Sequence, residues 1–304
     1  MVALHNALAL FDVDLTNNKQ GAVMNWITEN KIPIGSWMES LVDWLTTHAD
    51  FIFDAISVSL EWLILNIVDI FIWLPPFVPM LAAAAVAWFL HRSLPLVIFV
   101  VCALLLILNL GYWQEMLETF VLVITATSIS IFFGVPIGIM AAHRPWLYTI
   151  LRPILDLMQT IPTFVYLIPT LVLFGLGVVP GLISTIVFAI AAPIRLTYLG
   201  ISKVPSELIE AGRAFGATPF KLLYKVELPA AMPSIMAGVT QCIMLSLSMV
   251  VISALVGADG LGKPVVRALN TVNISQGFEA GLAIVLVAII LDRICKAPAA
   301  KGVK

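Results

Sequence analysis

The chain has 304 residues, of which 61% are hydrophobic and only 11% are charged, and its formal net charge is −2. Such a small polar fraction cannot cover the surface of a water-soluble globule of this length, so the composition excludes an ordinary soluble domain and indicates a membrane protein. A net charge near zero gives no bulk signature of nucleic-acid binding. The three cysteines are too few and too scattered for a disulfide framework.

Residues 1–74 form the first predicted region. The weak apolar stretch at its start follows no Lys or Arg and precedes Asp12 and Asp14, which is not the order of a signal peptide, so we expect the region to remain in the mature protein.

Residues 51–74 are apolar enough to resemble a membrane span, but four carboxylates fall within one sector of the expected helix. This stripe predicts an amphipathic helix that lies in the membrane interface. The alternative is an eighth span whose acidic face packs against protein. The carboxylates belong to Asp50, Asp54, Glu61 and Asp69.

Seven apolar segments follow Pro75, and each approaches the roughly 20 residues that a helix needs to cross the hydrocarbon core. None alternates with a period of two, and backbone groups in lipid must bond within their own segment, so all seven are predicted to be helices. The predicted fold is an all-α integral membrane protein, a polytopic bundle of about seven transmembrane helices. The segments are 76–91, 93–112, 117–142, 146–174, 180–200, 236–257 and 276–294.

The basic residues in the short loops predict the orientation of these segments. If the spans alternate, most of the Lys and Arg residues fall on one side, including Arg92, Arg144 and the tail 297–304. That side is expected to be the cytoplasm, which places the C-terminus inside and the N-terminal region outside. Lys263 and Arg267 are exceptions on the outer side.

The longest polar interruption covers residues 202–234 and predicts two short helices that meet at an elbow. Pro205 suits a helix start, Gly216 a left-handed helix end, and Thr218 an N-cap before a first-turn proline, while Pro229 is expected to end the second helix. Each helix has an apolar face that one hairpin cannot bury, so an external partner is expected to cover the rest. These faces carry Leu208, Ala211, Phe215, Phe220, Leu223 and Tyr224.

This loop resembles the cytoplasmic loop of ABC importer permeases, which reads E-A-A, three residues, G, nine residues, then I-x-L-P. Here Gly212 replaces the third-position alanine and Val226 replaces the isoleucine. In that family the elbow docks in a cleft of the ATPase, so that closure of two ATPases moves the membrane helices. The alternative is an ordinary amphipathic hairpin. The matching positions are Glu210, Ala211, Gly212, Gly216, Val226, Leu228 and Pro229.

The resemblance extends over residues 114–295, and the segments Leu151–Pro169 and Met244–Gly262 are similar to the permeases of glycine betaine, proline and choline importers. It implies a type I (MetI-like) permease core over 114–296, preceded by a two-helix hairpin over 75–113. The segment Gly260–Leu291 is closer to the choline members, which favours choline over glycine betaine.

Several polar, aromatic and proline residues in the fourth and sixth spans are candidates for lining a translocation path. A proline removes a backbone donor, so a carbonyl at membrane depth must be satisfied by protein or by water in a cavity. The alternative is that these residues only kink and pack the helices. The candidates are Gln159, Thr160, Pro162, Thr163, Phe164, Tyr166, Ser246 and Ser248.

No nucleotide or metal site is expected in this chain. Gly257–Lys263 has the glycine and lysine spacing of a P-loop, but Pro264 stands where Ser or Thr must reach magnesium, and no strand precedes it. The four histidines have no metal-like spacing, and no catalytic constellation can be assembled. ATP and Mg are therefore expected on a partner ATPase, and the chain itself is not expected to be an enzyme.

The sequence thus predicts a multi-pass permease of a bacterial inner membrane that works as a homodimer, with ATPase subunits, an extracytoplasmic solute-binding protein and membrane lipids as partners, and no nucleic acid. One alternative is a secondary transporter driven by an ion gradient, which requires intramembrane charges; the candidates Asp156, Glu279 and Asp292 lie near span ends. A second alternative is a membrane enzyme or scaffold.

Overall fold

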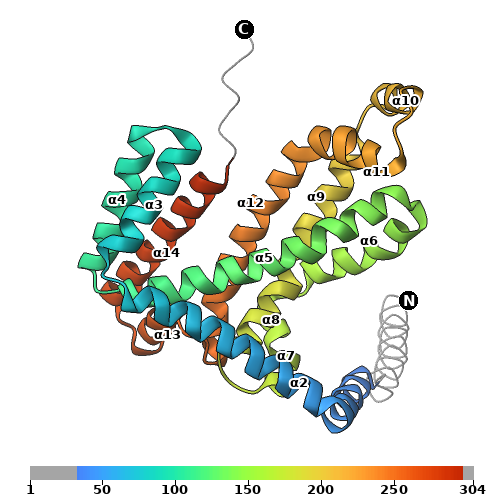
Figure 1. Ribbon diagram of the computed structural model, residues 1–304. Helices are drawn as coiled ribbons and strands as arrows, with labels where there is room; N and C mark the ends of the chain where they lie inside the picture. Colours follow the sequence, from blue (N-terminus) through green and yellow to red (C-terminus); the bar gives the residue numbers. More distant parts are fainter. Residues whose placement is uncertain (1–32, 297–304) are drawn as a thin grey trace, which may run out of the picture. The chain divides into compact units, whose positions relative to one another are not determined.

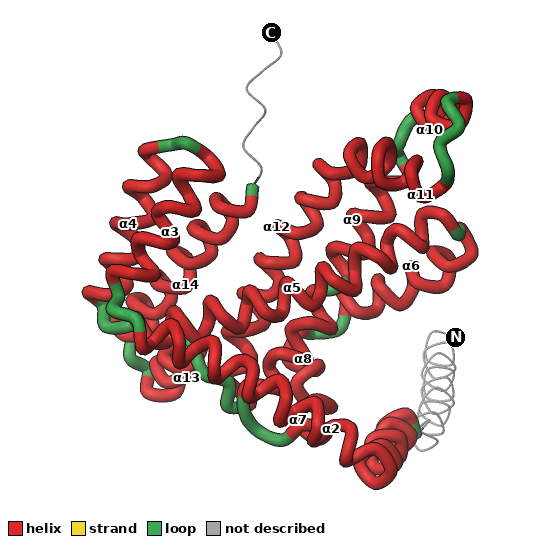
Figure 2. Tube along the Cα trace, viewed as in Figure 1, coloured by secondary structure: helices red, strands yellow, loops and turns green. Residues whose placement is uncertain are grey.

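The computed structural model describes residues 33–296, which form helices joined by short turns and contain no strand (Figure 2). The chain divides into two compact units, residues 1–49 and 50–304, and in the first only the beginning of helix α2 is described. Residues 1–32 and the predicted tail 297–304 lie outside the described residues. The α-helices are α2 (Ile34–Trp73), α3 (Phe77–His91), α4 (Leu94–Asn109), α5 (Trp113–His143), α6 (Pro145–Thr160), α7 (Leu167–Phe174), α8 (Val178–Ala189), α9 (Ala191–Ser202), α10 (Ser206–Ala214), α11 (Pro219–Leu222), α12 (Leu228–Ser253), α13 (Gly262–Thr271) and α14 (Ile274–Cys295).

Helices cover the predicted spans, although the span 146–174 is divided by a break between α6 and α7. Among the described residues, five helical stretches are long and apolar enough to cross a membrane: α2, α5, α8 with α9, the run 219–256 that contains α12, and α14. The bent run from α6 to α7 is a sixth candidate. α3 and α4 are shorter, with 15 and 16 residues. The fold is all-α, as predicted, and about seven membrane helices are compatible with it.

Helix α9 lies between α5 and α12 and makes close contact with both. A Cβ atom at Gly138 of α5 would lie 2.7 Å from the carbonyl oxygen of Ile194, and a Cβ at Gly238 of α12 would lie 3.1 Å from the Cβ of Leu196. Small residues let helices in a membrane approach until their backbones nearly touch. The two glycines therefore allow the tight packing of the three helices.

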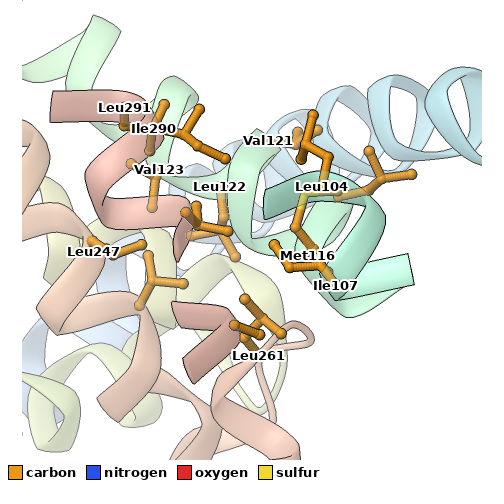
Figure 3. Close-up of a cluster of buried hydrophobic side chains, with 14 of the residues drawn as sticks. Leu104, Ile107, Met116, Val121, Leu122, Val123, Leu247, Leu261, Ile290 and Leu291 are labelled. Atoms are coloured by element: carbon orange, nitrogen blue, oxygen red, sulfur yellow. The ribbon is translucent and has the colours of Figure 1, made fainter. Parts of the chain in front are cut away.

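The largest buried apolar cluster joins α4, α5, α12 and α14, and its side chains point toward one another (Figure 3). Short hydrophobic contacts of this kind, each weak, sum to a large dispersion energy in a closely packed interior. The cluster ties the hairpin of α3 and α4 to the rest of the bundle. The residues labelled in Figure 3 are Leu104, Ile107, Met116, Val121, Leu122, Val123, Leu247, Leu261, Ile290 and Leu291.

Several helix ends gather at one end of the bundle. His91, the last residue of α3, has Nε2 2.7 Å from the carbonyl oxygen of Arg293 in α14; a carbonyl only accepts, so Nε2 donates. Figure 1 shows the turn after α3, the C-terminal end of α14 and the start of α12 at the same end as α10. We call this the elbow end. Arg92, which follows α3, and Arg293, near the end of α14, lie there.

The part of α2 from residue 50 onward contacts the end of the bundle opposite the elbow. The ring of Phe53 packs edge-on against Phe174 at the end of α7, with centroids 5.3 Å apart, and Phe71 packs edge-on against Phe120 near the start of α5, at 6.2 Å. Between them, Ile64 is buried beside the start of α8. Residues 53–71 extend about 27 Å along the helix, and these partners all lie at one end (Figure 1).

Candidate functional site

The predicted elbow is present in the structure. Helix α10 begins at Ser206, directly after Pro205, and the chain leaves it through Gly216, whose φ of +73° lies in the left-handed region that glycine tolerates. The Thr218 side chain then caps α11 by accepting a hydrogen bond from the Lys221 N–H at 3.4 Å. Figure 1 shows α10 and α11 beyond the ends of α9 and α12. The start signals predicted for both helices are confirmed.

Pro229 was predicted to end the second helix, and this was wrong. The chain continues from α11 through a π-helical turn, Leu223–Glu227, directly into α12, so residues 219–256 form one run. Pro229 lies in the first turn of α12, where its missing N–H removes no bond within α12. In the π-helical turn before Pro229, hydrogen bonds join residues that are five positions apart instead of four. This wider spacing accommodates the missing N–H of the proline.

The elbow exposes a set of large apolar side chains at its surface. Phe215 is 92% exposed, Phe220 76% and Tyr224 66%, and Leu208 is exposed as well. Glu210 and Ala211 lie on the exposed part of α10 between them. Exposed aromatic residues of this kind within one short loop indicate a surface that binds another protein. The faces predicted to need a partner are therefore open in this chain.

Gly212, the residue that departs from the family motif, lies where α10 meets α11. A Cβ atom built at Gly212 would lie 2.6 Å from Cδ1 of Leu222, which is buried, and 3.6 Å from Cγ2 of Val226. A glycine here lets α10 lie close against Leu222. The remaining motif positions follow in order, with Val226 and Leu228 half-buried and Pro229 exposed.

The predicted span 146–174 is not one kinked helix. It consists of α6, a short break at Ile161–Pro162, the 3₁₀ turn Thr163–Tyr166 and α7, and its two arms are bent by 108°. An α-helical Pro162 would leave the Met158 carbonyl without a donor, and the Tyr166 hydroxyl donates to that carbonyl. The break is therefore satisfied within the protein, and Tyr166 has a structural contact that sequence reasoning did not anticipate.

The path candidates fall into two groups. Around the break, Thr160, Pro162 and Phe164 are exposed, while Gln159, Thr163 and Tyr166 are half-buried. On α12, Ser248 is exposed, and its hydroxyl donates to the Met244 carbonyl at 3.1 Å.

Ser246, by contrast, is fully buried. It accepts a hydrogen bond of 3.4 Å from Thr127 of α5. This is a contact between packed helices. The structure thus brings the candidates at the break to an accessible surface and places Ser246 inside the bundle.

The carboxylates that an ion-coupled transporter would need all have local partners. Asp156 of α6 is 2.7 Å from Arg195 of α9, and Asp292 is 2.7 Å from Lys296. Glu279 accepts a hydrogen bond from Ser275 at 3.3 Å. Within residues 33–296 no group of three or more metal-binding side chains is found.

A polar cavity of about 270 Å³ lies at the end opposite the elbow, between the start of α5 and α13, and sequence reasoning did not single it out. Burial, followed by the charges of Glu279 and Glu115, raises the pKa of Tyr112 above its ordinary value of 10.0. Lys263 of the P-loop-like segment pairs with Asp259 at the same place. The residues that line the cavity are Tyr112, Gln114, Glu115, Glu118, Asp259, Lys263, Pro264, Arg267 and Gln276.

A polytopic helical bundle with an exposed elbow between two of its spans has the architecture of an importer permease. Two inward-facing structures of the MetNI methionine ABC transporter contain chains with this fold. The first has a TM-score of 0.50 and 28% identity, and the match covers 59% of this chain and 91% of that chain. The second has a TM-score of 0.51 and 25% identity, and the match covers 60% of this chain and 94% of that chain.

Residues 134–296 match the family model described as "Binding-protein-dependent transport system inner membrane component". The chain belongs to this family, the permease subunits of ABC importers, and within it to the glycine betaine, proline and choline group. It is thus a multi-pass inner-membrane transport component, as predicted.

Three curated relatives cover most of the chain. The glycine betaine transport system permease protein OpuAB of Bacillus subtilis is 46% identical, covering 87% of this chain and 93% of the relative. The glycine betaine/carnitine transport permease protein GbuB of Listeria monocytogenes is 44% identical, with 88% and 95% covered. The glycine betaine/proline betaine transport system permease protein ProW of Escherichia coli is 42% identical, with 88% and 75% covered.

Proposed function

We propose that this chain forms the translocation path of an ATP-driven importer for a quaternary ammonium compound, and that it works as a homodimer with two separate ATPase subunits and an extracytoplasmic solute-binding protein. The observation that carries the coupling part of the proposal is the exposed elbow, in which Glu210 lies among uncovered aromatic side chains. A docked ATPase would bury these side chains, and the ATPase itself would bind ATP and Mg. The relatives give no support to a transporter driven by an ion gradient.

The proposed substrate is glycine betaine. The three relatives that cover most of the chain carry glycine betaine and not choline in their names, while OpuCD of Bacillus subtilis, named for glycine betaine, carnitine and choline together, is 32% identical over 60% of this chain. The choline preference expected from Gly260–Leu291 therefore becomes the second candidate. Around the α6–α7 break, the exposed ring of Phe164 offers a face to a quaternary ammonium, an interaction of about 0.5 to 2 kcal/mol.

Uptake into sealed vesicles that contain this chain, its ATPase and its binding protein tests the proposal. We expect labelled glycine betaine to accumulate only when ATP is supplied on the ATPase side, and unlabelled glycine betaine to compete better than unlabelled choline. Vesicles that lack the ATPase are the control. Accumulation without ATP or without the ATPase would exclude the importer, and stronger competition by choline would reverse the order of the two substrates.

We also propose that residues 51–74 form an interfacial helix along the outer membrane surface, which places the elbow and the C-terminus in the cytoplasm. This proposal is supported by the position of the partners of Phe53 and Phe71, which all lie at the end opposite the elbow. The exposed Trp62 and Trp73 suit headgroup depth. A helix that spanned the membrane would carry its two ends to opposite ends of the bundle.

Thiol labelling distinguishes these two arrangements. In a chain whose three native cysteines are replaced by serine, we expect Phe51→Cys and Leu74→Cys both to react with a membrane-impermeant reagent added outside. Phe215→Cys, at the exposed elbow, is expected to react only after the membrane is permeabilised. Labelling of only one of the two α2 positions from outside would show that the helix spans the membrane.

A further inference from the structure

Glu227 carries a carboxylate that is almost completely buried at the elbow end of the bundle. The residue is 5% exposed and forms the last position of the π-helical turn, directly before Leu228 and Pro229. In the loop motif I-x-L-P it occupies the unspecified position x. A buried carboxylate requires a partner, because its desolvation is costly. Glu227 is therefore a residue whose role the motif does not explain.

The partner of Glu227 comes from another helix. Nε2 of His143, the last residue of α5, lies 2.8 Å from Oε2 of Glu227. Among residues 33–296, no group, His143 included, meets this oxygen in hydrogen-bond geometry, so the contact with Nε2 is a short polar contact. Within residues 33–296 the imidazole, half-exposed at the helix end, is the one basic side chain that lies within 4 Å of this carboxylate. The contact links the coupling loop to a helix that precedes it by a long stretch of sequence.

The second ring nitrogen of His143 has a hydrogen-bond partner in its own helix. Nδ1 lies 2.9 Å from the carbonyl oxygen of Ile139, and because a carbonyl only accepts, Nδ1 carries a hydrogen and donates. Nε2 is the nitrogen that faces the carboxylate of Glu227. The hydrogen bond of Nδ1 thus orients the ring relative to α5 and toward Glu227.

An apolar contact extends from this pair into the bundle. Val135 and Ile139 of α5 and Leu228 all pack against one buried cluster, which consists of Ile201 of α9 and Ala231 and Ile235 of α12. Apolar side chains of this kind allow neighbouring helices to slide by small steps, whereas a charge pair fixes one register. The His143–Glu227 pair lies at the end of this contact that is closest to the elbow, where a force on the loop would arrive first.

We infer that the His143–Glu227 pair is a positioning contact that makes α5 move together with the coupling loop, so that movement of the elbow reaches α5 as well as α12. This inference rests on the proposed function. Without the pair, a docked ATPase would still move α12, which continues from the elbow without interruption, but α5 would lose its polar attachment to the loop. ATP would then be hydrolysed with less solute transported.

The test measures labelled glycine betaine transported per ATP hydrolysed by the complete importer in vesicles. Glu227→Gln and His143→Gln are each expected to lower this ratio about tenfold, within the range typical of a lost coupling between two sites. The double variant should be no worse than the single ones, because both remove the same contact. His91→Gln, which alters a histidine at the end of α3 and leaves the loop unchanged, is the matched control and should keep the ratio.

A cross-linking experiment separates a lost connection from a folding defect. In a chain with its native cysteines replaced, His143→Cys combined with Glu227→Cys should lower the ratio, and a short bifunctional thiol reagent should restore it by joining the two positions. A restored ratio requires that the chain was inserted and folded, so it supports the inference even if the single variants are poorly stable.

Two results would overturn the inference and leave the proposed function intact. One is a ratio of solute transported to ATP hydrolysed that stays within twofold of the wild type in the single variants, and the other is a cross-link that leaves this ratio low. A wild-type complex without ATP-driven uptake would overturn the proposed function, and the inference with it, because the pair would then have no movement to transmit. The wild-type measurement therefore distinguishes the two failures.

Discussion

Replacing Glu210 with alanine is expected to lower ATP-driven uptake at least tenfold while the chain still inserts into the membrane. Glu210 is exposed on α10, so its side chain contributes little to the stability of this chain. In the proposed complex it is covered by the ATPase, and truncating one partner of a covered charge pair across an interface commonly weakens binding by more than tenfold. The measurement is uptake together with the amount of ATPase that remains bound to the purified permease.

Glu207→Ala is the matched control for this prediction. Glu207 lies in the first turn of the same helix, is also exposed, and is not one of the motif positions. The substitution removes the same charge from the same helix, so a general effect of charge loss on α10 would appear in both variants. Normal uptake by Glu210→Ala, or an equal loss in Glu207→Ala, would show that Glu210 has no particular part in coupling.

The elbow was predictable from the sequence because its signals are local. A proline before a serine, a glycine in the left-handed region and a capping threonine each act within a few residues, and the structure places all three as predicted. The apolar segments were predictable for a similar reason, since membrane thickness sets the length of a span. In both cases the chain carries the information within one element.

The errors and omissions depend on contacts between elements or on a type of turn that the sequence does not signal. Pro162 indicates a disturbed helix, but the 108° bend is held by the Tyr166 hydroxyl on the far side of the break. Pro229 indicates a helix end only when the preceding turn is α-helical, and a π-helical turn has no comparable sequence signal. The pair of His143 and Glu227 joins distant parts of the chain, so neither residue stands out in the sequence.

The candidate path residues give a second example of what the sequence could not predict. Ser246 and Ser248 are two positions apart in one helix and are equally suitable by chemistry. Two positions correspond to about 200° around an α-helix, so one serine faces α5 and is buried while the other is exposed. Sequence reasoning could find the helix and the residue type, but not the direction in which each hydroxyl points.

Gly138→Ala is expected to destabilise the permease by about 1 to 3 kcal/mol, the usual range for overpacking a tight interior. The added Cβ would lie 2.7 Å from the carbonyl oxygen of Ile194 and 2.7 Å from the Cβ of Thr197, both in α9. A backbone oxygen cannot rotate away, and Thr197 is fully buried, so α9 itself must move. The thermal unfolding midpoint of the purified chain, followed by tryptophan fluorescence, should fall clearly below that of the wild type.

Gly281→Ala is the matched control because it makes the same substitution in α14, where a Cβ atom would meet no other atom within 4 Å. Alanine is the better helix former by about 1 kcal/mol, so this variant should unfold at or slightly above the wild-type midpoint. Equal midpoints for the two variants would mean that α5 and α9 can separate at no cost. Because α9 leads within a few residues into α10, such freedom would also contradict a bundle in which movement of the elbow is transmitted through closely packed helices.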